Sequence, residues 1–146
     1  EDFSYIDCGG SSGENDGVGV SVGKDAEALN FWDCNLGDRG VESLCSEIIK
    51  LGPSAKIKRL NLWGNSIGDS GCKALARVLG KEGPGLVRVD LWNNQIGDKG
   101  AKLLADALRH NTLIVSLNLW QNKIGEEGAS ELLAALKTNA SLTSMD

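Results

Sequence analysis

The sequence predicts an α/β fold in which strand–helix units are stacked in a row. A phrase recurs four times, with steps of 31, 29 and 28 residues between the first residues of successive copies. Each copy joins a short alternating segment to a longer segment with helical spacing. Such a unit cannot bury its apolar face alone, whereas stacked copies bury one continuous core. The copies begin at Leu29, Leu60, Val89 and Leu117.

The first part of each copy predicts a short strand. Residues 60–63 read Leu-Asn-Leu-Trp, a pattern with a period of two. Successive side chains of a strand point to opposite faces. We therefore expect Leu60 and Leu62 to face the core, and Asn61 and Trp63 to lie on the other surface of the sheet.

The second part of each copy predicts a helix. In the third copy a stripe with i, i+3, i+4, i+7 spacing is formed by Ala101, Leu104, Ala105 and Leu108. An acid stands at each expected helix start, where the positive end of the helix dipole stabilises it. These acids are Asp38, Asp69, Asp98 and Glu126. The turns back to the next strand are indicated by Gly52-Pro53 and Gly83-Pro84-Gly85.

The repeated pattern LxxLxLxxNxIGxxGAxxLAxAL resembles the leucine-rich repeats of the ribonuclease-inhibitor-like class, and it is similar to the repeats of NOD-like receptors. It covers residues 26–146. The resemblance implies an α/β leucine-rich-repeat solenoid, a horseshoe segment with a parallel sheet on the concave side and helices on the convex side. It also implies that Asn65, Asn94 and Asn122 bond buried backbone groups after their strands. Cys34 takes this position in the first copy.

We expect residues 1–25 to form a degenerate N-terminal repeat or cap with a Gly-rich loop. The segment FSYIDC aligns with a later LNFWDC at an offset of 26 residues, which places Phe3 opposite Leu29. The Gly-rich and polar stretch 9–17 argues against a helix, and the alternating stretch 18–22 favours a short extended segment. The alternative is a disordered leader over the same residues.

Residues 26–146 are expected to hold four leucine-rich repeats and the start of a fifth. The segment 138–146 restarts the phrase, with Met145 one 28-residue step after Leu117. A bare solenoid end exposes a core face and an unpaired strand edge. We therefore expect that either more protein follows or another chain covers this end.

The cysteines are spread along the chain, at Cys8, Cys34, Cys45 and Cys72, and the only histidine is His110. Without a CxxC pair or clustered histidines, we expect no metal site. We interpret Cys45 and Cys72 as core residues, and we expect reduced thiols in a cytoplasmic location. Asn139-Ala140-Ser141 fits the N-glycosylation pattern.

Charge and motifs exclude several classes of function. The net charge of −5 argues against nucleic acid as a partner, because nucleic-acid binding needs a basic face, and it disfavours anionic membrane surfaces. No apolar run approaches the roughly 18 residues of a membrane helix. We see no nucleophile–base pair, paired carboxylates or phosphate loop, so we expect no enzyme activity and no cofactor. Ran GTPase-activating proteins share this repeat class, but no catalytic motif carries over.

All four tryptophans occupy one position of the repeat: Trp32, Trp63, Trp92 and Trp120. Two further rows are expected beside them on the concave face, namely Asn30, Asn61, Asp90 and Asn118, and Arg59 with Arg88. Indoles on strands about 4.8 Å apart can stack face to face with an offset. Exposed apolar strips mark interaction sites, and Trp and Arg are enriched among binding hot spots. We therefore expect these residues to bind the ligand.

The leading hypothesis is a non-catalytic protein-interaction module that binds a protein or peptide through this concave face. Three alternatives stay open. The first is a carbohydrate-binding module, since Trp faces flanked by Asn and Asp suit sugar rings. The second is a purely structural scaffold in which the tryptophans brace the sheet. The third is self-association into a homo-oligomer through the Trp strip or the open ends.

Overall fold

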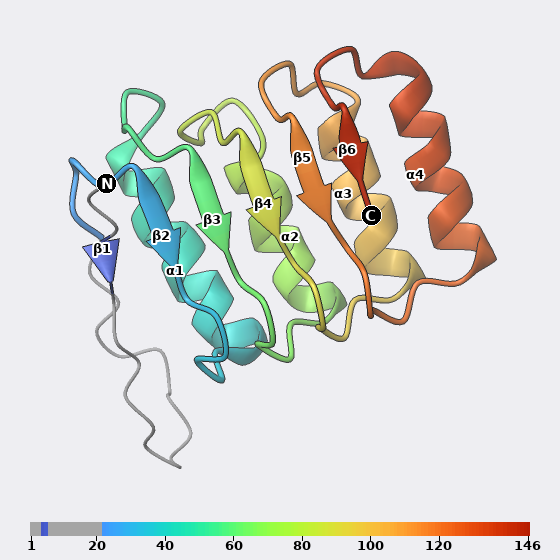
Figure 1. Ribbon diagram of the computed structural model, residues 1–146, viewed down its shortest axis with the longest axis horizontal. Coiled ribbons are helices and arrows are strands. Elements are labelled where there is room, and N and C mark those ends of the chain that lie inside the picture. Colours follow the sequence, from blue (N-terminus) through green and yellow to red (C-terminus); the bar gives the residue numbers. More distant parts are fainter. Residues whose placement is uncertain (1–3, 6–21) are drawn as a thin grey trace.

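The computed structural model describes residues 4–5 and 22–146, in which one parallel sheet is covered on one face by a row of helices (Figure 1). The six described strands lie side by side in chain order. Every connection between neighbouring strands from β2 onward passes through a helix. The fold is therefore the α/β leucine-rich-repeat solenoid that the sequence predicts. We call the sheet face opposite the helices the concave face.

The elements follow the repeat closely. The strands are β1 (Ser4–Tyr5), β2 (Ala28–Asn30), β3 (Arg59–Asn61), β4 (Arg88–Asp90), β5 (Ser116–Asn118) and β6 (Ser144–Met145). The helices are α1 (Gly37–Leu51), α2 (Asp69–Val78), α3 (Asp98–Leu108) and α4 (Glu126–Thr138). None of the described helices is long and apolar enough to cross a membrane.

The strand register confirms the repeat alignment. Leu60 lies opposite Leu29 on one side and Val89 on the other, and Leu117 continues the row to Met145. At the N-terminal edge the alignment was wrong by one residue, because Ser4 rather than Phe3 lies opposite Leu29. Repeat periodicity does not constrain this edge, because FSYIDC matches the repeat only in part. The stretch 9–17 and residues 18–21 lie outside the described part of the chain.

The core runs the length of the molecule between the sheet and the helices. Leu60 and Leu62 are buried, as the alternation predicts. The stripe of α3 also faces inward: Ala101, Leu104, Ala105 and Leu108 are each 0% exposed. Cys45 and Cys72 are buried free thiols in this core, which confirms their interpretation as packing residues.

The asparagines that share one position of the repeat form a ladder after the strands. Oδ1 of Asn65 accepts hydrogen bonds from the backbone N–H groups of Cys34 (3.1 Å) and Leu36 (3.2 Å) in the preceding repeat. Its Nδ2 donates to the carbonyl oxygens of Phe31 (2.7 Å) and Leu62 (3.0 Å). Each amide thus satisfies buried backbone groups of two repeats, as the resemblance implies.

The acids lie in the first turns of their own helices, as expected, and three of them have a second role. Oδ1 of Asp69 accepts hydrogen bonds from the N–H groups of Gly97 (2.8 Å) and Gly100 (2.9 Å), which open the next helix. Asp38 and Asp98 make the same pair of contacts to their following repeats. Each acid therefore caps the helix after its own, and a Cβ on Gly100 would lie 2.7 Å from Asp69 Oδ1.

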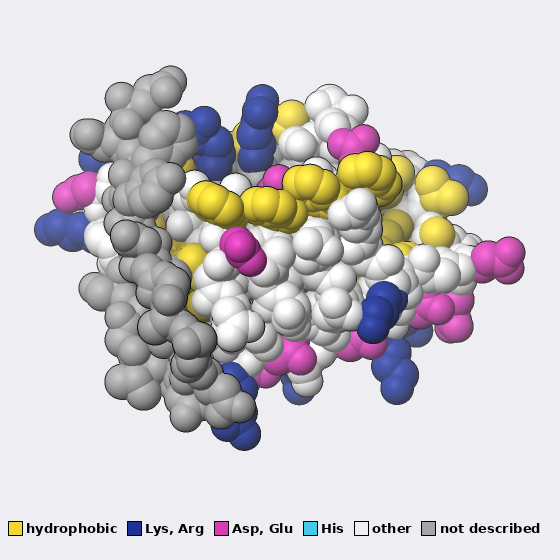
Figure 2. Space-filling model, turned by 60° about the horizontal axis from the view of Figure 1, so that its bottom comes forward, with side chains coloured by type: hydrophobic (Ala, Val, Ile, Leu, Met, Phe, Trp, Pro, Cys, Tyr) yellow, Lys and Arg dark blue, Asp and Glu magenta, His cyan; other side chains and the backbone are white. Residues whose placement is uncertain are grey.

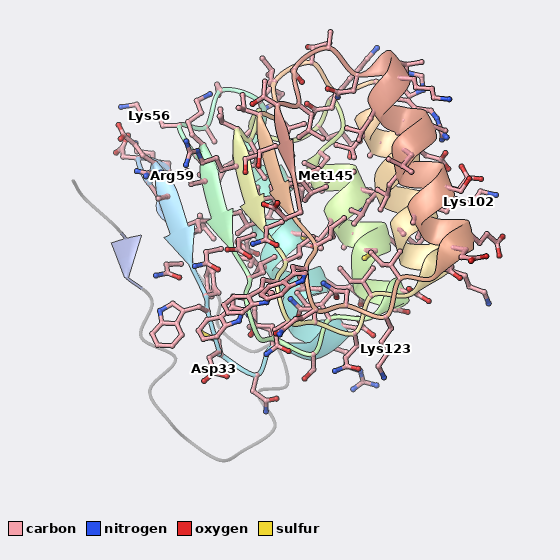
Figure 3. All side chains as sticks on the ribbon, turned by 45° about the vertical axis from the view of Figure 1, so that its right-hand side comes forward. Asp33, Lys56, Arg59, Lys102, Lys123 and Met145 are labelled. Carbon is pink, nitrogen blue, oxygen red and sulfur yellow. The ribbon has the colours of Figure 1, made fainter. Side chains whose placement is uncertain are left out.

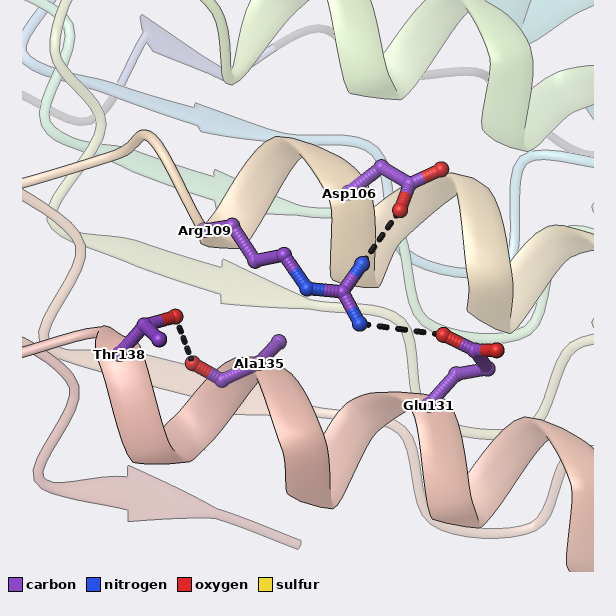
Figure 4. Close-up of polar contacts among 5 residues, drawn as sticks. All are labelled: Asp106, Arg109, Glu131, Ala135 and Thr138. Atoms are coloured by element: carbon purple, nitrogen blue, oxygen red, sulfur yellow. Dashed lines mark hydrogen bonds and ion pairs between the residues drawn. The ribbon is translucent and has the colours of Figure 1, made fainter.

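The last two helices are also joined at their surface (Figure 4). The guanidinium of Arg109 donates to Asp106 in α3 and, at 3.1 Å, to Glu131 in α4. Near the end of α4, the Thr138 hydroxyl donates to the Ala135 carbonyl oxygen (3.1 Å). Of these contacts, the one between Arg109 and Glu131 joins α4 to α3.

One expectation about a single side chain needs correction, and the asparagine of one sequence triplet is buried. Cys34 is disulfide-bonded, and its partner is outside the described residues because Cys45 and Cys72 are free. The expectation of reduced thiols is therefore wrong for Cys34, and the cytoplasmic location stays a prediction. Asn139 of the glycosylation triplet is buried, and its Nδ2 donates to the carbonyl oxygens of Leu108 and Asn111. Attaching a glycan to Nδ2 would remove one of these two N–H donors.

Candidate functional site

The four tryptophans lie just beyond the strands, not within them as the alternation predicts. β3 ends at Asn61, and Trp63 follows two residues later. Parallel pairing of the backbone nevertheless continues past the strand ends: Leu62 N–H donates to the Asp90 carbonyl (2.8 Å) and Gly64 N–H to the Trp92 carbonyl (3.0 Å). This extended pairing keeps the tryptophans in register.

The Asn/Asp row sets the direction of each tryptophan. Oδ1 of Asn61 accepts a hydrogen bond from the N–H of Trp63 (3.1 Å), and Asp90 does the same for Trp92 (2.9 Å). Asn30 and Asn118 make the equivalent bonds to Trp32 (3.4 Å) and Trp120 (3.0 Å). Such Asx turns bend the chain two residues on.

A left-handed residue follows every tryptophan. Its φ is 52° at Asp33, 69° at Gly64, 55° at Asn93 and 54° at Gln121. Gly, Asn and Asp enter this region most readily, and three of the four residues found there are of these types. All four tryptophans therefore share one local backbone geometry, an Asx turn before the indole and a left-handed residue after it.

The indoles form one continuous stack across the repeats. Ring centroids are 5.4 Å apart between Trp32 and Trp63, 5.1 Å between Trp63 and Trp92, and 5.9 Å between Trp92 and Trp120. The interplanar angles are 20°, 14° and 13°. Each inner ring is therefore covered on both faces by its neighbours, and only ring edges and the two outer faces are open to a ligand.

The exposed edges of the stack form a hydrocarbon ridge, which we call the Trp ridge (Trp32, Trp63, Trp92 and Trp120). Figure 2 shows it as a continuous line of hydrophobic side chains on a largely polar surface. Trp32 is 43% exposed and Trp120 60% exposed. Within the described residues, the indole N–H groups of Trp63 and Trp92 are buried without a hydrogen-bond partner, so the edges that these two rings expose are hydrocarbon.

A hollow of about 310 Å³ lies on the concave face beside the ridge, and we call it the arginine hollow. Its wall includes Asn30, Asn61, Asp90, Asn118, Arg59 and Arg88, which are all the predicted site residues other than the tryptophans. Arg59 and Arg88 are exposed and lie opposite each other in adjacent strands. The concave face thus combines an apolar ridge with a polar, partly cationic hollow.

The wall also includes Ala28 and Ser116, which the repeat places at the two ends of the Arg row, and Asp146, which sequence reasoning missed. Asp146 has a signal in the repeat, since it takes the Asn/Asp position of the fifth copy. The Asp146 carbonyl accepts a hydrogen bond from Leu119 N–H (2.7 Å), which continues the pairing of the other repeats. The structural task of the Asn/Asp row, to hold the tryptophans, was also missed.

The described residues hold few candidates for metal binding or catalysis. They contain no cluster of three or more His, Cys, Asp or Glu side chains that could hold a metal ion. Burial raises the pKa of the Cys45 and Cys72 thiols to about 12, so both stay protonated near neutral pH. His110 lines a different hollow, among the loops between helices and strands.

Comparisons with known proteins agree with the geometry. The family model described as "Leucine Rich repeat" matches residues 27–45, 54–76, 86–105 and 110–133. No curated protein matches the sequence. Among solved structures, the chain is similar to leiomodin-1 actin-binding site 2, with a TM-score of 0.73 and 18% sequence identity over 84% of this chain and 70% of that one. At this identity the likeness shows the fold alone.

Proposed function

Because this chain belongs to the leucine-rich-repeat family, we propose that it is a non-catalytic protein-interaction module that binds a protein or peptide across its concave face. The observation that carries the proposal is the Trp ridge, four stacked indoles that form a continuous apolar strip on the surface. Contiguous exposed apolar surface usually marks an interaction site. The leiomodin-1 segment bears a name that describes actin binding, and it gives one instance of this architecture in a protein-binding role.

A rigid ridge favours binding because little freedom is lost when a partner docks. Ring-on-ring stacking, Asx turns and backbone pairing together hold each indole. Ordering a mobile side chain costs about 0.5–1.5 kcal/mol per residue on association. A ridge that is ordered before binding avoids much of that cost. More of the free energy gained by burying its apolar edges is therefore available for affinity.

The stacking argues against the carbohydrate alternative. Sugar rings pack their apolar faces on the open faces of aromatic rings, and here Trp63 and Trp92 have both faces covered by other indoles. Only the outer faces of Trp32 and Trp120 remain for a sugar. A long flat platform for a glycan chain is therefore not available along this ridge.

Self-association has one observation in its favour. At the β6 end, a hollow of about 380 Å³ has a largely apolar wall that includes Leu119, Trp120, Ile124, Leu132, Leu133 and Met145. Leu133 is 58% exposed there. A second copy docking on this end would cover Trp120 but would leave the centre of the ridge free. We treat it as the second candidate, with oligomeric state as its test.

The proposal is tested by selecting peptide ligands. Random 12-residue peptides displayed on phage are selected on the immobilised chain, and the winners are titrated into it in solution. We expect bound peptide to change Trp fluorescence and to shield the indoles from iodide, because the tryptophans lie only on the ridge. Light scattering on the same samples reports any self-association. Selected peptides that bind with Trp emission and iodide quenching unchanged would contradict binding at the ridge.

A further inference from the structure

One end of the stack is uncovered by the described strands and helices. Among these elements, β6 pairs only with β5, and α4 packs against no helix other than α3. Figure 3 shows this end, with Met145 on β6 and α4 beside it. The apolar hollow of about 380 Å³ opens here, and Ala129 and Leu133 of α4 both line it. The side chains that α4 directs away from α3 therefore define what can dock.

The preceding repeat identifies this outward face of α4, because α3 has a neighbour on the same side. Asp98 accepts hydrogen bonds from two N–H groups at the start of α4. Ala101 and Ala105 are each 0% exposed. The guanidinium of Arg109 reaches Glu131 of α4 at 3.1 Å. One repeat later, the residues equivalent to Asp98, Ala101, Ala105 and Arg109 are Glu126, Ala129, Leu133 and Lys137.

These four residues of α4 form a stripe whose two ends carry opposite charges. Their spacing of i, i+3, i+7 and i+11 places them on one face of the helix. All four are exposed, and Leu133 is 58% exposed. Within the described part of the chain, the side chains of Glu126 and Lys137 make no ion pair or hydrogen bond. The stripe thus has a free acid at its start, a free base at its end and apolar residues between them.

Such a stripe is complementary to itself when a second copy of α4 runs antiparallel to it. Glu126 then meets Lys137 of the second copy, and Leu133 lies over the small Ala129 of the second copy. The first pair is centred at position 131.5 and the second at position 131. At about 1.5 Å per residue, the two centres differ by about 0.8 Å along the helix. One two-fold axis therefore produces all of these contacts, each of them twice.

We propose, resting on the second candidate function, that a second copy of this chain covers the open end with the two α4 helices antiparallel. Leu133 of each copy enters the apolar hollow of the other beside Ala129. The buried apolar surface supplies affinity, and the charges at the helix ends set the orientation. A parallel two-fold arrangement is disfavoured, because it would set Glu126 against Glu126 and Lys137 against Lys137.

Sedimentation equilibrium of the chain at concentrations up to about 1 mM tests the proposal. We expect the mass to rise from 15.4 kDa to twice that value and to stop there, because a two-fold interface closes at two copies. Lys137→Glu and Glu126→Lys should each weaken the dimer at least tenfold, since each sets like charges together at both ends. An equimolar mixture of the two variants should dimerise within threefold of wild type, because opposite charges meet again in the mixed dimer.

Two matched controls accompany these variants. Lys73→Glu makes the same change of charge on an exposed residue of α2, two helices away, and should leave dimerisation within twofold. Leu133→Ala should weaken the dimer at least tenfold, and Leu113→Ala should not, although Leu113 is 57% exposed. Far-UV circular dichroism of each variant confirms that it folds.

The possible failures are distinguishable. A dimer that Lys137→Glu does not weaken, or whose variants are not restored by mixing, would overturn the antiparallel arrangement and leave self-association standing. Growth of the mass beyond the dimer would also overturn it, because an open-ended contact is not two-fold. A mass of 15.4 kDa at every concentration would overturn this inference and the second candidate together, and would leave peptide binding at the Trp ridge standing.

Discussion

Asn94 is a buried polar side chain, 3% exposed, that serves two repeats at once. Its Oδ1 accepts from the N–H groups of Asn65 (3.0 Å) and Ile67 (2.9 Å), and its Nδ2 donates to the carbonyl oxygens of Leu62 and Leu91, both at 3.0 Å. A buried donor left without an acceptor costs about 1–3 kcal/mol. The ladder is therefore expected to be a large contributor to stability relative to its size.

Replacing Asn94 by Ala should lower the free energy of unfolding by about 3–5 kcal/mol, because two buried N–H groups lose their acceptor. Urea denaturation followed by circular dichroism measures the change. Gln95→Ala is the control, since Gln95 is exposed and should stay within about 0.5 kcal/mol of wild type. A loss below about 1 kcal/mol for Asn94→Ala would show that the ladder is replaceable by water.

The core thiols give a second prediction at this scale. Burial raises the pKa of Cys45 and Cys72 from the ordinary 9.0 to about 12, so the folded protein retains protons that the unfolded chain releases. This contribution to stability is fully present below pH 9 and is lost as pH rises from 9 to 12. At pH 8 a thiol reagent should react slowly with the native protein and rapidly in urea. Rapid native labelling would contradict the burial of these residues.

At the scale of elements, the Asp side chains at the helix starts link each repeat to the next. Asp69 in α2 bonds two N–H groups at the start of α3, and Asp98 does the same for α4. Adding a carboxylate acceptor at a helix start stabilises it through hydrogen bonding and through the helix dipole. The helices are thus linked in a row by side chains that each belong to one repeat and cap another.

Asp69→Ala should therefore lower the free energy of unfolding by about 1–2 kcal/mol. Glu126 takes the same position in the last helix, and no hydrogen bond is found for its side chain among the described residues. Glu126→Ala should change the free energy of unfolding by less than about 0.5 kcal/mol, because among the described residues Glu126 interacts only with the dipole of its own helix. Equal losses for the two variants in urea denaturation would indicate that each acid acts on its own helix after all.

The repeat period made much of this predictable. Strand positions, the buried Leu60 and Leu62, the stripe of α3 and the gathering of the tryptophans follow from spacing within one copy. The roles of Asp69 and Asn61 could not be predicted in this way. The hydrogen bond of Asp69 forms only when copies are stacked, and that of Asn61 forms only when the chain turns. The disulfide at Cys34 was missed because its position reads as a substitute for ladder asparagine.

On the scale of the whole molecule, stability should vary along the row of helices. α2 packs between α1 and α3, whereas α4 packs against α3 alone among the described helices. In stacked-repeat proteins, stability is approximately a sum of repeat terms and nearest-neighbour interfaces. Native-state hydrogen exchange should therefore show slower exchange in α2 and α3 than in α4. Uniform protection across the helices would contradict this picture.

The central claim is that the Trp ridge binds a protein partner instead of serving only to brace the sheet. The most direct test measures the affinity of a selected peptide for the Trp120→Ala variant and compares it with the affinity for the Leu113→Ala variant. Both residues are largely exposed, at 60% and 57%, but Leu113 lies in a loop away from the concave face. We predict at least a tenfold loss for Trp120→Ala, less than a twofold change for Leu113→Ala, and similar stability for both. Unchanged affinity in Trp120→Ala, with a marked drop in its stability, would contradict the claim and leave the stack a structural brace.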